Sequence, residues 1–272
     1  MLLPVEDVED NAMTYETLQL GLEDRVATVT LNRPKVLNAL NATMTRELDE
    51  LFAELAMDES VRVVLLCGAG GKAFAAGADI AELAGADADS GERLAGGVQR
   101  VFRRIETMGK PVIACIDGFA LGGGCELAMA CTLRLASSTA RLGQPEIKLG
   151  LIPGYGGTQR LPRLVGRGAA LKMLLTGAMV DAAEALRIGL VDEVVPQENL
   201  MERAGELARL IAGMPPLAVA AAIEVVDRGA DLRLDEALAL EASIFGRLCG
   251  TEDKSEGTRA FLEKRSAVWL GR

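Results

Sequence analysis

The spacing of hydrophobic and polar residues predicts strands and helices that alternate along the first half of the chain. Short apolar or alternating runs predict strands at residues 15–20, 26–31, 61–67, 111–116 and 133–136. Apolar residues recur at helical spacing over 41–55 and 92–107, and Asn41 is placed to cap the first of these helices. This order is typical of right-handed crossover units in a largely parallel sheet, and no fixed-period sequence repeat accompanies it.

The pattern becomes mostly helical after about residue 166. Helices are predicted at residues 167–175, 182–188, 199–212, 217–228, 235–248 and 252–267, with a short strand at 191–195. We therefore predict three parts: an acidic N-terminal tail at 1–14, an α/β core domain at 15–200 and a C-terminal helical region at 201–272.

Two glycine-rich segments interrupt the α/β pattern. Residues 68–79 are rich in Gly and Ala and are predicted to form a loop, whereas three consecutive glycines at 122–124 join a strand to an apolar helix at 125–131. Without Cβ atoms, the backbone N–H groups of 122–124 can approach a ligand closely. The first N–H groups of the helix lack intrahelical partners and favour negative charge, so this turn is a candidate oxyanion site with Glu126 in the first helical turn.

The amino-acid composition limits the kinds of catalytic group, partner and compartment that fit this chain. The chain of 272 residues has a net charge of −10 and no histidine, so acid and base roles fall to carboxylates, and a Ser-His-Asp triad is excluded. The acidic balance argues against nucleic acid as the main partner. The five cysteines form no Cys-x-x-Cys pair, which fits a reducing compartment. The sequence has neither a signal-peptide pattern nor a long uncharged apolar run, so we expect a cytoplasmic protein without a membrane partner.

Glu126 and Glu146 are the candidate acid–base pair, because each follows a segment rich in turn-forming residues. Two carboxylates that hold one water can add water to a polarised substrate or remove it. Taken singly, Glu126 can equally be an exposed glutamate at a helix start, and Glu146 a solvated loop residue. A dinucleotide fingerprint is a further reading of residues 68–73, although no amphipathic helix follows it.

Five segments in one order resemble the crotonase superfamily, the enoyl-CoA hydratase/isomerase family. They are residues 32–40, 73–80, 120–128, 143–146 and 150–161, and the resemblance covers about residues 15–268. It is strongest to short-chain enoyl-CoA hydratases, which retain both glutamates. The resemblance implies an α/β crotonase (ClpP-like) spiral of repeated ββα units, with a C-terminal helical region that forms trimers or dimers of trimers.

The resemblance also implies a role for each matching residue. The backbone N–H groups of Ala78 and Gly123 would form an oxyanion hole for a thioester carbonyl. Glu126 would activate water for attack at Cβ, and Glu146 would deliver a proton to Cα. The acyl-CoA substrate would be bound by Lys35, Leu37, Ala76, Ala78, Asp79, Ile80 and Gly123. Coenzyme A is then part of the substrate, and neither a separate cofactor nor a metal is expected.

The implied reaction is hydration of a trans-2-enoyl-CoA to the 3-hydroxyacyl-CoA, as in fatty-acid β-oxidation. Two alternatives remain open: another crotonase reaction, such as double-bond isomerisation or hydration of a branched or aromatic acyl-CoA, and a non-catalytic CoA-binding subunit. Ala81 stands where several family members carry Lys, whereas Phe261 and Lys264 match positions that reach toward a neighbouring subunit's ligand. Residues 83–102 and the loop near Tyr155 are expected to set the acyl chain length.

Overall fold

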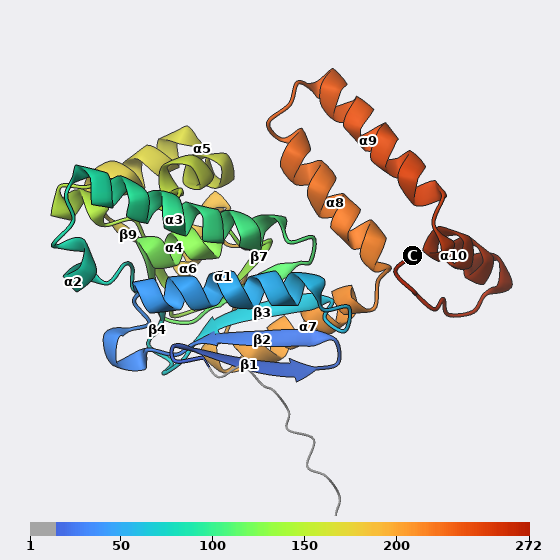
Figure 1. Ribbon diagram of the computed structural model, residues 1–272, viewed down its shortest axis with the longest axis horizontal. Coiled ribbons are helices and arrows are strands. Elements are labelled where there is room, and N and C mark those ends of the chain that lie inside the picture. Colours follow the sequence, from blue (N-terminus) through green and yellow to red (C-terminus); the bar gives the residue numbers. More distant parts are fainter. Residues whose placement is uncertain (1–14) are drawn as a thin grey trace, which may run out of the picture.

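A six-stranded sheet forms the centre of the computed structural model, which describes residues 15–272 (Figure 1). The acidic tail predicted at 1–14 lies outside the described residues. A hairpin begins the sheet, and the remaining neighbours pair in parallel. In spatial order the strands are β1 (Leu18–Glu23), β2 (Val26–Leu31), β3 (Val63–Gly68), β5 (Val112–Ile116), β7 (Leu133–Ser137) and β10 (Glu193–Val195).

Helices cover both faces of this sheet. Alternate residues of β3 point to opposite sides, as they must in a strand. Val64 and Leu66 pack in the larger core, which also holds side chains of α1 (Ala42–Met57) and α3 (Ala88–Thr107). Val63 and Leu65 pack in a second cluster with α7 (Leu200–Ala212). Because it is buried on both faces, the strand consists of a continuous apolar run rather than an alternating one.

A second sheet has four strands of three residues each, and it supplies the surface on which the site is built. Its order is β4 (Ala73–Ala75), β6 (Phe119–Leu121), β8 (Arg141–Gly143) and β9 (Met179–Asp181). Successive units place one strand in each sheet and then a helix: β3–β4–α3, then β5–β6–α4 (Gly123–Met129), then β7–β8–α5 (Gly157–Thr176). The predicted α/β fold of repeated ββα units is confirmed.

The four short strands are the main feature that the hydrophobic pattern did not predict. Residues 68–79 were expected to be a loop but contain β4, and β6, β8 and β9 were not predicted. Three residues are too few to display an alternating period, so only pairing with neighbouring strands reveals them. The remaining short elements are η1 (Pro34–Val36), α2 (Ile80–Leu83), η2 (Glu146–Leu149) and η3 (Gln197–Asn199).

Several predicted helices differ from the structure at their ends. The helix expected at 167–175 is the second half of α5, which breaks at Gly166 (φ 76°, ψ 157°). The helix expected at 252–267 is α10 (Glu252–Glu263), which ends where Lys264 adopts a left-handed conformation (φ 55°). The helix α6 (Ala182–Ile188) has the predicted bounds, and Asn41 caps α1 by accepting a hydrogen bond from the backbone N–H of Met44.

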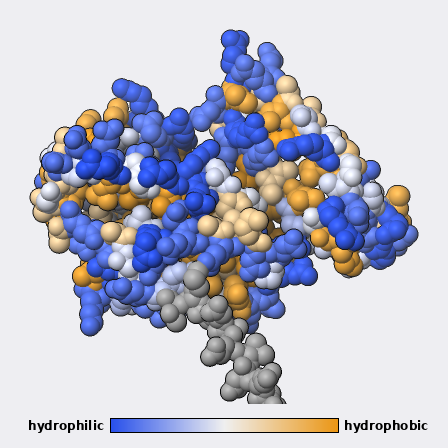
Figure 2. Space-filling model, viewed as in Figure 1, coloured by the Kyte–Doolittle hydropathy of each residue, from blue (hydrophilic) through white to orange (hydrophobic). Residues whose placement is uncertain are grey.

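The C-terminal helices α8 (Pro216–Gly229), α9 (Leu234–Cys249) and α10 extend away from the sheets (Figure 1). Hydrophobic residues lie on their surface among polar ones (Figure 2). The most exposed are Val226, Leu234, Phe245, Phe261 and Leu262. Within residues 15–272 no single helix is long and apolar enough to span a membrane, and only the segments 197–212 and 216–229 taken together reach that length and composition, with a bend of 106° between them.

The contact between α4 and β4 leaves no room for a side chain at Gly124. A Cβ atom there would lie 2.0 Å from the carbonyl oxygen of Ala75. We predict that Gly124→Ala destabilises the protein by about 2–3 kcal/mol, because the backbone of β4 must move. Gly168→Ala is the control, since a Cβ atom at this exposed helical position meets nothing within 4 Å. Urea denaturation should show no loss for Gly168→Ala, and an equal loss in both variants would contradict the prediction.

Candidate active site

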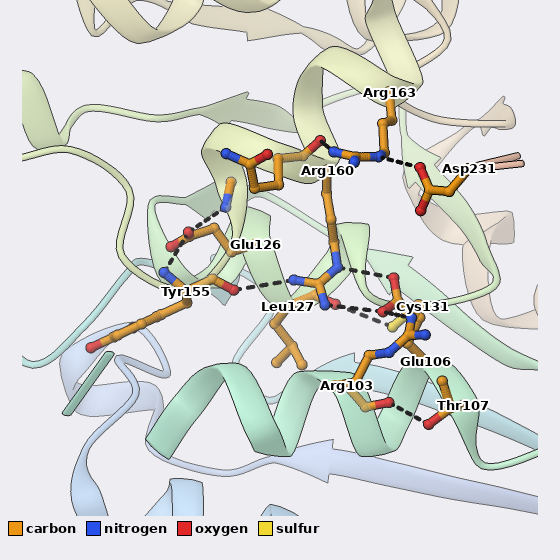
Figure 3. Close-up of polar contacts among 12 residues, drawn as sticks. Arg103, Glu106, Thr107, Glu126, Leu127, Cys131, Tyr155, Arg160, Arg163 and Asp231 are labelled. Atoms are coloured by element: carbon orange, nitrogen blue, oxygen red, sulfur yellow. Dashed lines mark hydrogen bonds and ion pairs between the residues drawn. The ribbon is translucent and has the colours of Figure 1, made fainter. Parts of the chain in front are cut away.

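Glu126 lies in the first turn of α4, and its side chain is buried, with 1% of its surface exposed. The Oε1 atom accepts two backbone hydrogen bonds, from the N–H of Tyr155 at 2.8 Å and from the N–H of Gly157 at 2.7 Å (Figure 3). Both donors come from the segment that leads into α5. A buried carboxylate needs such donors, because burial removes most of its hydration.

Glu146 begins η2, shortly after β8 of the second sheet. A Cβ atom at Gly122 would lie 2.6 Å from Oε1 of Glu146, so only glycine allows the carboxylate to approach the turn before α4. The backbone of Gly122 also has φ 50°, which favours glycine. The buried amide of Gln144 lies 3.2 Å from both carboxylate oxygens when its nitrogen is turned to donate to them.

Two backbone N–H groups beside the carboxyls have no acceptor within residues 15–272. Leu40 pairs with the two neighbours of Ala78, donating to Gly77 O at 2.8 Å and accepting from Asp79 N at 2.8 Å. Successive N–H groups of an extended chain point to opposite sides, so the N–H of Ala78 faces away from Leu40. Gly123 is the first residue of α4, whose N–H has no intrahelical partner.

The turn before α4 and the segment that carries Ala78 lie next to each other. A Cβ atom at Gly122 would lie 3.7 Å from Cα of Gly77. The site therefore brings together all four residues expected to do the chemistry: the carboxyls of Glu126 and Glu146 and the free N–H groups of Ala78 and Gly123.

Burial shapes the electrostatics of the pair. It raises the pKa of Glu126 to about 7, and although the N–H of Gly157 lowers this pKa, the charge of Glu146 adds to the rise. Burial also raises the pKa of Glu146. Glu126 is buried and Glu146 is half-buried, and two such neighbouring carboxyls disfavour double ionisation, so near neutral pH the pair holds a proton.

Tyr155 forms one wall of the site. Its ring packs edge-on against Phe102 of α3, with centroids 6.0 Å apart and an interplanar angle of 87°. A Cβ atom at Gly123 would lie 2.9 Å from the Tyr155 ring. Burial raises the pKa of the phenol to about 12, so Tyr155 is neutral at physiological pH. The ring of Tyr155 thus contacts Phe102, in the region 83–102 that was expected to set acyl chain length, and lies beside Gly123 at the start of α4.

The residues expected to bind the acyl-CoA lie along two segments that pair with each other. Ala76 N donates to Leu37 O at 3.0 Å, which places Leu37 and Ala76 side by side. Lys35 is exposed on η1, and Ile80 is 54% exposed at the start of α2. The carboxylate of Asp79 caps α2 through Ala81 N (3.2 Å) and pairs with Arg33 (3.1 Å).

The sequence did not identify the groups that hold the carboxyls in place. The N–H donors of Tyr155 and Gly157 lie 29 and 31 residues from Glu126 in the chain. The glycines at 154, 156 and 157 were visible as a glycine-rich motif, but nothing in the sequence showed which side chain they serve. Gln144 and Arg160 likewise lie in recognised segments without an assigned role.

Comparison with known proteins shows the family of the chain. Residues 21–272 match the model of the family described as enoyl-CoA hydratase/isomerase. The chain belongs to this family. It is 48% identical over 253 residues to the short-chain-enoyl-CoA hydratase of Clostridium acetobutylicum, covering 93% of this chain and 97% of that protein.

Two further relatives span almost their full lengths. The crotonyl-CoA hydratase of Syntrophomonas wolfei is 44% identical over 260 residues, covering 96% of this chain and 100% of that protein. The crystal structure of an enoyl-CoA hydratase from Bacillus anthracis superimposes with a TM-score of 0.91 at 39% identity, covering 94% of this chain and 100% of that one. Within residues 15–272, no cluster of three or more His, Cys, Asp or Glu side chains could hold a metal ion.

The raised pKa of Glu126 has a consequence for stability. The folded state binds this proton more tightly than the unfolded chain, so the contribution of Glu126 is most favourable at low pH and is lost as pH rises toward 7 and above. We predict that Glu126→Gln, which stays neutral, is more stable than the parent protein by about 2–3 kcal/mol at pH 8. This advantage should shrink toward pH 5.5.

Urea denaturation at both pH values, at one protein concentration, measures the difference. Glu198→Gln, at an exposed position, is the control and should change little at either pH. A Glu126→Gln advantage that does not depend on pH would contradict the raised pKa.

Proposed function

We propose that this protein is an enoyl-CoA hydratase, which adds water to the double bond of a trans-2-enoyl-CoA. The observation that carries the proposal is the meeting of a buried carboxyl, that of Glu126, and a half-buried one, that of Glu146, with two backbone N–H groups that have no acceptor within residues 15–272. The relatives named as hydratases of short-chain enoyl-CoA and crotonyl-CoA support it.

The two N–H groups, from Ala78 and Gly123, are suited to bind the thioester carbonyl oxygen of the substrate. Hydrogen bonds to this oxygen draw electron density from the conjugated double bond and make Cβ electrophilic. They also stabilise the enolate charge that forms when the nucleophile adds, which is where such donors contribute most to the rate. Both donors belong to backbone fixed by pairing and by a helix start, so they need no reorganisation during the reaction.

The carboxyls divide the proton transfers. In the reacting form Glu126 is the ionised carboxyl, which the two N–H groups at its Oε1 favour against the effect of burial, and it accepts a proton from the attacking water as the oxygen bonds to Cβ. Glu146 holds the shared proton and donates it to Cα. Each turnover leaves the proton on Glu126 rather than on Glu146, and a return transfer between the neighbouring carboxyls restores the starting state. Both groups act from one side of the substrate, which gives syn addition.

The substrate contacts follow from the same segments. In this proposal the exposed Lys35 would meet the CoA phosphates, and Leu37, Ala76, Asp79 and Ile80 would line the path of the CoA moiety; the exposure of Lys35 and the pairing of Ala76 with Leu37 support this. The carboxylate of Asp79 is paired with Arg33, so Asp79 contributes chiefly by holding the Ala78 segment in place. Double-bond isomerisation and hydration of a branched or aromatic acyl-CoA are the second candidates, and the retention of both glutamates favours hydration over isomerisation.

We further propose that the protein is a homo-oligomer, a trimer or a dimer of trimers, that acts in the cytoplasm in fatty-acid β-oxidation. The exposed hydrophobic residues on α8–α10 support an oligomer, because water-exposed apolar surface of this kind is stabilised by contact with another copy. Phe261 is 84% exposed and Lys264 ends α10, which suits them to a neighbouring subunit's ligand.

Loss of crotonyl-CoA absorbance tests the hydration directly. We expect turnover by the wild type and a decrease in kcat of about 10²–10⁴-fold for Glu126→Gln and for Glu146→Gln, since each removes one proton transfer. Both variants should still bind a saturated acyl-CoA with affinity close to that of the wild type. Rates within tenfold of wild type in both variants would falsify the two-carboxylate mechanism, and binding without wild-type turnover would indicate a non-catalytic CoA-binding subunit.

Oligomerisation is tested with charged residues on the C-terminal helices. We expect light scattering to give the mass of a trimer or hexamer for the wild type. Phe245→Glu should lower this mass, because a charge placed at a contact between copies is desolvated without a partner. The exposed Leu22→Glu on β1 is the control and should not change the mass. A monomeric wild type would overturn this part of the proposal.

A further inference from the structure

The segment that holds Glu126 is conformationally permissive. Glycine occupies positions 154, 156 and 157, and Gly156 has φ 112°. Glycine allows many backbone conformations, so the local sequence does not fix the segment in one of them. It therefore does not by itself keep the N–H groups of Tyr155 and Gly157 pointing at Glu126. A contact from outside the segment must fix it.

Arg160 makes this contact. It lies in the first turn of α5, and its Nη1 donates to the carbonyl oxygen of Tyr155 at 3.1 Å (Figure 3). A Cβ atom at Gly156 would lie 2.3 Å from the same Nη1, so the guanidinium rests directly on the glycine segment. Tyr155 therefore accepts a hydrogen bond from Arg160 through its carbonyl and donates one to Glu126 through its N–H.

Glu106 of α3 fixes the guanidinium in turn. Nε of Arg160 donates to Oε1 of Glu106 at 3.0 Å, and Nη2 donates to Oε2 at 3.1 Å. This two-point geometry sets the orientation of the guanidinium plane as well as its place. The pair is largely screened from water, with 16% of the Arg160 side chain and 23% of the Glu106 side chain exposed. Arg103 donates to Glu106 from the same helix at 2.7 Å.

We propose that Arg160 is a positioning residue for the reaction, which, held by Glu106, keeps the Tyr155 and Gly157 N–H groups on the Glu126 carboxylate. This inference rests on the proposed hydratase function. The side chain of Arg160 donates to Tyr155 O and to Glu106, and not to either catalytic carboxyl. It therefore acts through the segment, and through its positive charge near Glu126.

Loss of Arg160 should change the titration of Glu126 in a defined direction. The cation and the two N–H donors all favour the ionised carboxylate, so their removal or loosening raises the pKa of Glu126. Since Glu126 acts ionised, the rise of kcat with pH should move to higher pH. A variant that is only less stable would lose activity at every pH and keep the same midpoint.

Other titratable groups lie near Glu126, Arg160 and Glu106, and their effects on the titration must be distinguished from that of Arg160. Glu146 faces Glu126 from η2, and Tyr155 stays neutral because its pKa is raised to about 12. Asp227 of α8 lies near Glu106 and Arg103, and burial, followed by the charge of Glu106, raises its pKa. Asp227→Asn is therefore measured alongside the Arg160 variants.

The experiment compares Arg160→Met, Arg160→Lys and Arg163→Met with the wild type in crotonyl-CoA hydration. We expect Arg160→Met to lower kcat about tenfold or more while KM changes much less, because the substrate contacts are intact. Arg160→Lys should recover part of kcat, since it keeps the charge but loses the two-point contact. Arg163→Met is the matched control, because Arg163, one turn further along α5, binds Asp231 and Gln159 O instead.

The pH profile decides between positioning and a merely structural role. An upward shift of the kcat midpoint in Arg160→Met, absent in Arg163→Met and Asp227→Asn, supports the proposal. An unchanged midpoint in Arg160→Met, or an equal shift in Asp227→Asn, overturns it. Infrared titration measures the midpoint of Glu126 ionisation without turnover. The carboxyl band of Glu126 is assigned as the band that is lost in Glu126→Gln. An inactive wild type would thus reject the hydratase function, and the infrared midpoints would still test Arg160.

Discussion

The buried carboxylate of Glu126 is the constraint on which the site depends. A carboxylate removed from water is costly unless donors surround it, and here two backbone N–H groups meet one oxygen at 2.7 and 2.8 Å. These donors come from a glycine-rich segment that must be held, which explains the contact with Arg160 and its ion pair with Glu106. The same burial raises the pKa of the carboxyl to about 7, near the value that a general base needs.

Close approach of other groups to the backbone is the second requirement, and glycine meets it at three places. At Gly122 a Cβ atom would strike Glu146, at Gly124 it would strike the carbonyl of Ala75, and at Gly157 it would lie 3.0 Å from Oε1 of Glu126. Gly122 allows the carboxyl of Glu146 to approach the turn before α4, and Gly124 allows α4 to pack against the second sheet. Gly157 allows its own N–H to reach Glu126. Side chains at these positions would separate the groups that the chemistry needs together.

Helices and long strands were predictable because each carries enough residues to display a period. Asn41 and the helical spacing of apolar residues after it predicted α1, and the apolar run that ends at Cys67 predicted β3. The strands of the second sheet have three residues each, so their identity depends on pairing with one another. The contacts of the Asp79 carboxylate were not predictable either, since Arg33, which it binds, lies 46 positions earlier in the chain.

By itself the sequence determined the α/β class, the absence of histidine chemistry, the two glutamates and the family motifs that surround them. Only the tertiary structure decided how Glu126 is held, because its donors lie about 30 residues away and belong to backbone atoms that every sequence has. The role of Arg160 depends in the same way on Glu106, 54 positions earlier in the chain. Every residue except proline has a backbone N–H, so donors of this kind have no signature in the sequence. They are identified only when the fold places them next to the carboxyl.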